Sequence, residues 1–437
     1  MGLKKKKRCY YNHDVPPGLK KMKPNPKIMI HQFTTLTIAM ALICLPFQNI
    51  MAKNPPETLL QKAQRIHEKA LTVDSHTDTP LRISRSGFDA GIHNDFATTG
   101  SCYDYPRMKE GGLDGAFFAV FTSQGKCDEE SYTKIYKTAL NLFDAIHQSV
   151  QKNSKLAGIA LNPDQFRKLV KEGKRTIFIG VENGYPLGTN LSCVQEFYNL
   201  GARYITLCHV KNNQLCDSSN DTIAAGGVTS FGKEVIKEMN RLGMMVDVSH
   251  ISDRSFYDVL KLSKTPVIAS HSCSRAMCDN PRNLTDDMLK ALSANGGVVQ
   301  MCILSDYVKK PTPNQERDAA MIALRAKYTS DMTDAQMDAI RKERDELNRK
   351  YPQKLATVSD VVDHIDHMVK VAGVDHVGIG TDLDGGGGVA DCQDVSQMLN
   401  ITIELVKRGY SEENIDKIWG GNLMRVMTQV EKYAMAK

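Results

Sequence analysis

Two residues with metal-binding side chains, His76 and Asp78, stand two positions apart in the stretch LTVDSHTDTP. The apolar residues before them are typical of a buried strand, and strand residues two positions apart project from the same face. Both side chains can therefore reach one metal ion. An H-x-D pair alone is weak evidence, because the same motif also arises as a loop-edge histidine near a helix-capping aspartate. A metal site needs further ligands from elsewhere in the chain.

Further histidines and carboxylates follow other strand-like stretches at the same relative place. One histidine at the end of a strand is more often a hydrogen-bonded core residue than a ligand. Four histidines and three carboxylates at matching places are hard to explain by separate structural roles, since buried charges need partners. These residues are His76, Asp78, Glu182, His209, His250, His271 and Asp382.

The mixture of imidazoles and carboxylates suits zinc or a similar divalent ion, and one carboxylate can bridge two ions. Two ions that share a water lower the pKa of that water and polarise a carbonyl group. The residue types therefore predict a binuclear metal centre that carries out hydrolysis.

Such a centre needs a scaffold that brings distant strand ends together. Short apolar or β-branched runs alternate with segments of helical spacing, which is the pattern of repeated βα units and a parallel sheet. Eight units predict a (β/α)8 TIM-like barrel, in which catalytic residues come from the carboxyl ends of the strands. An open, doubly wound sheet is the alternative. The predicted strands span residues 70–76, 115–122, 175–183, 202–209, 243–250, 266–272, 296–304 and 376–384.

The barrel domain is predicted over residues 53–437, with the excess length in insertions. One insertion, at about 311–352, is rich in Ala, Arg, Asp and Glu and predicts a charged helical pair. We interpret this pair as a solvated addition rather than a partner-binding element, because charge runs usually face water. Two closing helices are expected between Ser411 and Tyr433.

Residues 1–52 have the composition of a leader. The formal net charge of the chain is +6, of which +8 falls in this segment (nine Lys or Arg against Asp14), so the remainder carries −2. The apolar run at 36–47 has signal-peptide length and is short for a membrane span. We therefore predict export to the periplasm, cell surface or extracellular space, with cleavage after Ala52 and no stable membrane span in the mature chain.

Two features of the leader leave alternatives open. Met29 could begin a more ordinary signal sequence, and the leader could remain as an uncleaved anchor. Because the basic cluster sits in the leader and no aromatic stacking surface accompanies it, nucleic-acid binding has little support.

The motifs VDSHTD, GVENGY, RYITLCH, MMVDVSH, ASHSCSRAMCDNPRN and VGIGTDLDGGGG resemble those of the membrane (renal) dipeptidase family of zinc metallopeptidases, a branch of the amidohydrolase barrels. The resemblance runs from about residue 70 to the carboxyl terminus and indicates a bacterial-type secreted member. It implies small dipeptides as substrates, two Zn²⁺ ions per chain and, since family members are often dimers, a homodimer as an open expectation.

The resemblance also implies a role for each site residue. His76 and Asp78 would bind the first zinc, Glu182 would bridge both ions, and His250 and His271 would bind the second. Among the remaining residues, His209 would stabilise the oxyanion, Arg282 would hold the substrate, and Tyr307 would lie near the substrate carboxylate. Asp382 would orient a metal-bridging hydroxide and carry a proton to the leaving amine. Asp384 is the alternative candidate for this role.

Nine cysteines follow the leader, an odd number without any C-x-x-C motif. By the resemblance, Cys127 would pair with a cysteine in the loop after His209, and we hypothesise a Cys127–Cys216 bond although Cys216 is displaced from the usual place. Cys278 matches a paired family cysteine, but position 310 is Lys, so no bond is expected there. The same loop lacks a tryptophan near Leu215, which leaves side-chain preference open.

Two other functions fit the sequence. The same barrel could cleave N-acyl D-amino acids or β-lactams, because only the pocket loops would differ. A non-catalytic surface protein on an inactive barrel is the other alternative, and its signature would be a missing ligand. All five predicted ligand positions are filled.

Overall fold

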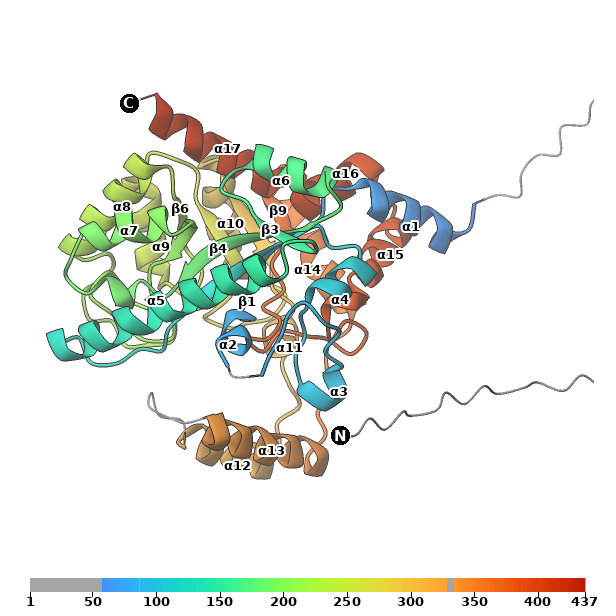
Figure 1. The fold of residues 1–437 in the computed structure, drawn as a ribbon, viewed down its shortest axis with the longest axis horizontal. Helices are drawn as coiled ribbons and strands as arrows, with labels where there is room; N and C mark the ends of the chain where they lie inside the picture. Colours follow the sequence, from blue (N-terminus) through green and yellow to red (C-terminus); the bar gives the residue numbers. More distant parts are fainter. Residues whose placement is uncertain (1–56, 86, 328–333, 437) are drawn as a thin grey trace, which may run out of the picture. The chain divides into compact units, whose positions relative to one another are not determined.

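A parallel sheet forms the centre of the computed structural model, which describes residues 57–436 apart from 86 and 328–333 (Figure 1). The predicted leader lies outside the described residues. Every pairing between named strands is parallel. The strands are β1 (Val73–Thr77), β2 (Gly115–Phe121), β3 (Ala157–Ile159), β4 (Arg175–Glu182), β5 (Ala202–Thr206), β6 (Met245–Asp247), β7 (Ile268–Ser272), β8 (Val298–Met301) and β9 (Val377–Ile379).

Eight of the strands follow one another in the order β1-β2-β4-β5-β6-β7-β8-β9. The ring closes just beyond β9, where Asp382 N donates to His76 O at 3.0 Å and Asp78 N donates to Leu383 O at 3.1 Å. The predicted (β/α)8 barrel is confirmed, and the open sheet is excluded. The remaining strand, β3, lies outside this order and pairs only with the start of β4. It was not predicted from the sequence. Its three residues are too few to show an alternating pattern.

Helices surround the barrel and connect its strands. Their starts follow ordinary capping chemistry: the Ser252 side chain, for example, accepts a hydrogen bond from Ser255 N at the start of α9. The helices are α1 (Leu59–Lys69), α2 (Pro80–Ile83), α3 (Phe96–Thr99), α4 (Tyr105–Glu110), α5 (Glu129–Lys152), α6 (Pro163–Lys171), α7 (Ser192–Asn199), α8 (Ser230–Leu242), α9 (Asp253–Leu262), α10 (Asp286–Ala294), α11 (Ser305–Val308), α12 (Gln315–Arg325), α13 (Asp334–Lys350), α14 (Val358–Ala372), α15 (Leu399–Lys407), α16 (Glu412–Asp416) and α17 (Asn422–Met435).

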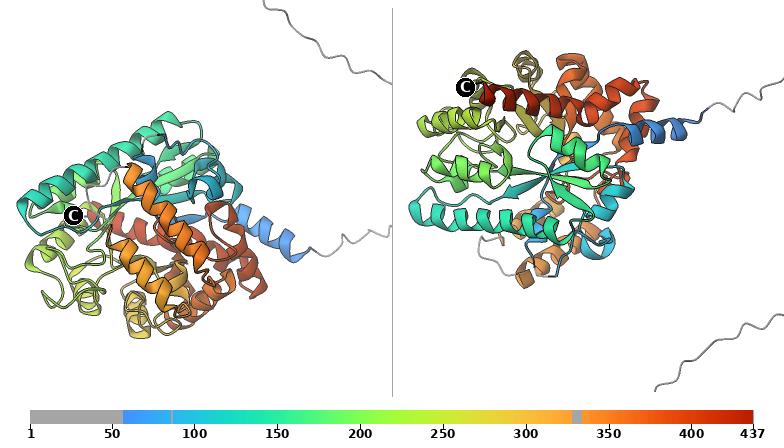
Figure 2. Two further views of the ribbon diagram at one scale, coloured as in Figure 1. Left: turned by 90° about the horizontal axis from the view of Figure 1, so that it is seen from below. Right: turned by 45° about the horizontal axis from the view of Figure 1, so that its top comes forward.

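Helix α17 closes the amino end of the barrel. Its residues Leu423, Met427 and Val430 belong to one buried cluster with inward-facing strand residues such as Phe178 and Tyr204. Figures 1 and 2 place α17 on one side of the barrel and the pair α12–α13 on the opposite side. The carboxyl ends of the strands therefore face the side on which the inserted helices lie.

The inserted segment contains the two helices α12 and α13, which lie side by side (Figure 2). Leu324 of α12 and Ile340 of α13 are buried, and Lys327 Nζ forms an ion pair with Glu343 at 2.5 Å. Among the described residues, no helix combines the length and the apolarity needed to span a membrane.

Candidate active site

The carboxyl ends of six barrel strands bring the predicted metal and catalytic residues together. Each residue lies at the last positions of a strand or within three residues after it, and all are buried except His209, which is partly exposed. They are His76 and Asp78 at β1, Glu182 at β4, His209 after β5, His250 after β6, His271 in β7 and Asp382 after β9.

Glu182 lies at the centre of this group. Its Oε2 is 3.2 Å from His76 Nε2, while its Oε1 is 3.1 Å from His250 Nε2 and 3.4 Å from His271 Nε2. His209 Nε2 lies farther away, at 3.6 Å from Oε1. The two oxygens of one carboxylate thus face different imidazoles, which is the arrangement a bridging ligand needs.

Three overlapping sets of side chains in the described part of the chain are close enough to hold a metal ion. The ligand atoms within each set lie within 4.8 Å of one another, and the sets are His76–Glu182–His271, Glu182–His209–His250 and His76–Asp78–Asp382. Two buried atoms, His76 Nε2 and Asp78 Oδ1, have no hydrogen-bond partner among these described residues. Buried polar atoms of this kind are costly unless a cation or a donor meets them. The donor set fits a metal.

Electrostatics point the same way. Burial raises the pKa of both Asp78 and Asp382 well above the usual carboxyl range. Burial also disfavours ionised Glu182, but His76 and the other imidazoles hold its pKa well below that range. For His76, burial is outweighed by Glu182, and the pKa rises to about 10. Burial thus disfavours the charged forms of Asp78 and Asp382, and a divalent cation beside them would favour those charged forms.

The backbone is strained at the same strand ends. Among the described residues, four non-glycine residues have a positive φ: Asn183 (75°), His250 (69°), Asp382 (62°) and Asp384 (65°). Asparagine and aspartate tolerate this region better than histidine does. Such strain is typical of functional sites, where the surrounding structure fixes the side-chain direction. Asn183 was not predicted, and its position directly after Glu182 is the only sequence signal for it.

The two residues predicted to hold the substrate adjoin the cluster. Arg282, in the loop after β7, is buried and donates to Ser272 Oγ at 2.8 Å and to the carbonyl oxygen of His271 at 2.6 Å. Its guanidinium carbon lies 5.8 Å from the ring centre of Tyr307 on α11. On the other side, the His209 ring lies 4.8 Å from that of Phe121, at the end of β2. Arg282 is thus held in place by the strand that carries His271.

Asp384, the alternative candidate for the role of Asp382, binds neighbouring loops instead of facing the cluster. Its carboxylate accepts hydrogen bonds from Arg82 Nε at 3.0 Å, Thr79 Oγ1 at 2.9 Å and Cys102 N at 2.9 Å. By contrast, Asp382 Oδ1 lies 4.0 Å from His76 Nε2. Asp384 therefore ties loops together, and Asp382 is the carboxylate that faces the cluster.

The predicted Cys127–Cys216 disulfide is wrong in this structure, where all nine cysteines of the described residues are free. Cys216 is fully buried, because its backbone pairs with that of Val228 and the side chain turns inward. Cys127 lies in an exposed loop just before α5. Sequence spacing does not reveal on which side of a loop a cysteine points.

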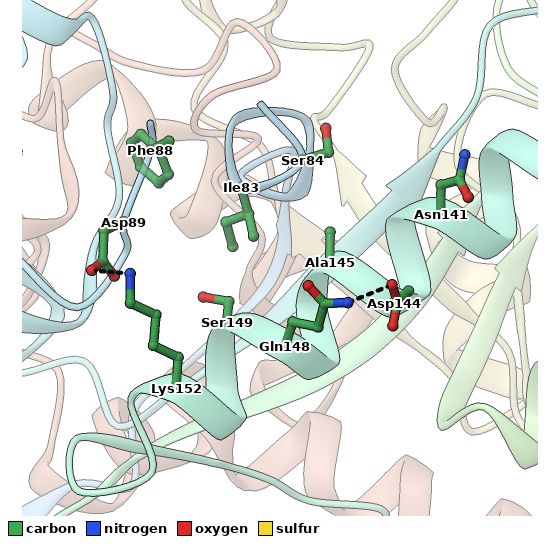
Figure 3. Close-up of a pocket in the computed structure, with 10 residues that line it drawn as sticks. All are labelled: Ile83, Ser84, Phe88, Asp89, Asn141, Asp144, Ala145, Gln148, Ser149 and Lys152. Carbon is green, nitrogen blue, oxygen red and sulfur yellow. Dashed lines mark hydrogen bonds and ion pairs between the residues drawn. The ribbon is translucent and has the colours of Figure 1, made fainter. Parts of the chain in front are cut away.

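A cavity of about 460 Å³ lies outside this site, between the β1 loop and helix α5 (Figure 3). Its wall includes Ile83, Phe88 and Ser149, and an ion pair of 2.8 Å joins Lys152 to Asp89. None of the strand-end residues lines it, so this cavity plays no part in the chemistry described above.

Comparison with known proteins agrees with the geometry. The family model of membrane dipeptidase (peptidase family M19) matches residues 60–437. Dipeptidase ataJ of Aspergillus terreus is 30% identical over 408 residues, which cover 86% of this chain and 88% of the relative. The uncharacterized dipeptidase C965.12 of Schizosaccharomyces pombe is 30% identical over 404 residues, covering 87% and 85%.

Solved structures share the fold. The probable dipeptidase PvdM from Pseudomonas aeruginosa superimposes with a TM-score of 0.75 at 30% identity, covering 87% of this chain and 100% of that one. A metallopeptidase from Rhodobacter sphaeroides, solved with a phosphinate mimic of the dipeptide L-Ala-D-Ala, gives a TM-score of 0.67 at 20% identity, covering 83% and 99%. The site and fold define a metal-dependent hydrolase of peptide bonds. The chain belongs to the membrane dipeptidase family, peptidase family M19.

Proposed function

We propose that this protein is a zinc-dependent dipeptidase that binds two zinc ions and hydrolyses the peptide bond of small dipeptides. The central position of Glu182 carries the proposal, because its two oxygens face different imidazoles at 3.1 to 3.4 Å. In this proposal His76 and Asp78 would hold one ion, His250 and His271 would hold the other, and Glu182 would contribute an oxygen to each. When bound, the ions supply Lewis-acid chemistry that lowers the pKa of a water and polarises the peptide carbonyl.

The protein's own groups move the proton and bind the charged atoms of the substrate. Burial keeps the pKa of Asp382 high, so this carboxylate can accept a proton from the attacking water and release it to the leaving amine nitrogen. Burial lowers the pKa of His209, so its neutral imidazole can donate a hydrogen bond to the oxyanion. Arg282 and the adjacent Tyr307 would bind the substrate carboxylate or its carbonyl oxygen.

A substrate panel tests this function. The purified protein, supplied with zinc, is assayed against L,L- and L,D-dipeptides, N-acyl D-amino acids and a β-lactam. L,D-dipeptides are included because a solved relative binds a mimic of L-Ala-D-Ala. We expect turnover of dipeptides. If the protein binds zinc but turns over only an N-acyl or lactam substrate, its function is another amidohydrolase reaction. If it turns over none of these substrates, the result favours a non-catalytic protein.

We also propose that the protein is exported through residues 1–52. The basic residues followed by a short apolar run support this, because the composition is that of a secretory signal. Fractionation of producing cells followed by amino-terminal sequencing tests it. An exported protein that begins at Lys53 is the expected result, and a cytosolic protein that retains its leader would contradict it.

A further inference from the structure

In two of the predicted ligands, His76 and His271, the imidazole nitrogen that faces away from the cluster meets a hydroxyl group. His76 Nδ1 lies 2.9 Å from the hydroxyl oxygen of Tyr204, and His271 Nδ1 lies 2.8 Å from Ser270 Oγ. The other nitrogen of each ring, Nε2, faces Glu182 at 3.2 Å and 3.4 Å, and that of His271 also lies 2.8 Å from His250 Nε2. Tyr204 and Ser270 come from β5 and β7, and neither was predicted, because in the sequence they look like ordinary core residues of those strands.

The direction of the Ser270 hydrogen bond follows from Asp247. This carboxylate is fully buried and accepts from Ser270 Oγ at 2.6 Å, Thr206 Oγ1 at 2.5 Å and the backbone amides of Ser249 and Ser270 at 3.0 and 2.8 Å. With four donors around it, Asp247 acts as an acceptor only, so the Ser270 proton points to it. Ser270 Oγ must then accept its hydrogen bond from His271 Nδ1–H.

Tyr204 behaves in the same way toward His76. Its hydroxyl donates to the carbonyl oxygen of Ser75 at 3.2 Å, which leaves the hydroxyl oxygen to accept from His76 Nδ1–H. In both rings Nδ1 therefore has an acceptor for its proton, which favours the neutral form with its lone pair on Nε2 once a metal ion displaces the proton from that nitrogen. A metal needs this neutral form of histidine, because it binds through the unprotonated nitrogen.

The surrounding packing holds the Tyr204 hydroxyl in place. The ring is fully buried and lies 5.3 Å from that of Phe117. It passes over Gly180 of β4, where a Cβ atom would lie 2.1 Å from the ring. Only glycine at this position lets a tyrosine of β5 reach a histidine of β1.

We propose that Tyr204 and Ser270 are positioning residues that fix the zinc-binding tautomers of His76 and His271, with Asp247 acting through Ser270. Each hydroxyl serves one of the two ions. The inference rests on the proposed zinc function and adds the residues that orient its ligands. Removing such outer partners typically weakens metal binding about 10- to 100-fold.

Zinc affinity, measured by competition with a chromogenic chelator, tests this without any assay of activity. Tyr204→Phe should weaken binding of the zinc ion held by His76 about 10- to 100-fold and leave the affinity for the second ion nearly unchanged. Ser270→Ala should weaken binding of the ion held by His271 by a similar factor and leave the affinity for the first ion nearly unchanged. Two matched controls remove buried or partly buried hydroxyls elsewhere: Tyr105→Phe, whose hydroxyl meets Ser149 at 3.1 Å, and Ser263→Ala, whose hydroxyl donates to Thr265 O at 2.8 Å. Neither control should change zinc affinity.

A second measurement needs no variant and so does not depend on variant folding. Histidine ¹⁵N chemical shifts of the zinc-loaded protein should report Nδ1-protonated, Nε2-bound rings for His76 and His271. Nε2-protonated rings, or variants that bind both ions as tightly as the unaltered protein, would overturn the inference. Failure of the unaltered protein to bind two zinc ions would instead contradict the proposed function.

Discussion

Asp382 and Asp384 stand two residues apart with nearly the same left-handed backbone, at φ 62° and 65°, yet their carboxylates face different surroundings. Asp384 is enclosed by Arg82, Thr79 and a backbone amide, whereas Asp382 approaches His76. One short loop after β9 thus supplies both the carboxylate that faces the cluster and a carboxylate that anchors the loop after β1.

Asp382→Asn should lower kcat about 10²- to 10⁴-fold, because the amide cannot accept a proton from the attacking water. Zinc-loaded protein is assayed on its best dipeptide at saturating concentration. Asp384→Asn is the matched variant: it leaves Arg82 without its ion pair and should lower the free energy of unfolding by about 3 kcal/mol while the folded protein stays active. Equal losses of kcat in both variants would contradict the assignment of Asp382.

Arg282→Lys should lower kcat/KM about 10- to 200-fold, the equivalent of about 1.5–3 kcal/mol for a charged hydrogen bond. Lysine keeps the charge, but it lacks the planar group that contacts Ser272 and His271 and that would also bind the substrate in the proposed function. Steady-state kinetics check this. Arg275→Lys is the control, because Arg275 lies in the same loop but pairs with Asp253 at 2.7 Å. A similar loss in the control would show that loop stability, rather than substrate binding, is affected.

Stability should fall as the pH drops below about 6.5. His67 is buried, its Nε2 donates to Gly111 O at 2.8 Å, and its Nδ1 lies 2.7 Å from Thr402 Oγ1. Burial lowers the pKa of His67, so on acidification the unfolded chain takes up a proton before the folded chain does. The contribution of neutral, buried His67 to the free energy of unfolding is therefore fully present above the pKa of this histidine in the unfolded chain. It is lost as the pH falls toward the lower pKa of His67 in the folded protein.

Urea unfolding at pH 7.5 and pH 5.5 measures this effect, with His67→Gln as the comparison. The variant should lose less stability between the two pH values than the unaltered protein, although other buried histidines such as His364 contribute in the same direction. An identical pH dependence in both proteins would remove His67 as a cause.

Much of the fold and site could be predicted from the sequence because barrel chemistry concentrates at strand ends. Apolar runs located all eight barrel strands, and polar residues at the ends of six of these runs, from His76 to Asp382, are the ones that the structure brings together. The orienting residues could not be found this way: Tyr204 sits inside a buried strand, and only the glycine opposite it, Gly180, admits its ring. Side-chain direction also explains why the predicted disulfide of Cys216 is absent, since the residue pairs with Val228 and its side chain points into the interior.

In the proposed function, Glu182 would bind both of the zinc ions that the reaction requires. Zinc content by elemental analysis and dipeptide turnover of the same sample test it most directly, with Glu182→Gln beside Glu196→Gln, a control whose carboxylate accepts from Tyr136 outside the site. We predict about two zinc ions per chain for the unaltered protein and the control, and loss of zinc and of turnover in Glu182→Gln. No bound zinc in the unaltered protein after zinc is supplied, or full turnover by Glu182→Gln, would contradict a binuclear zinc site held by Glu182.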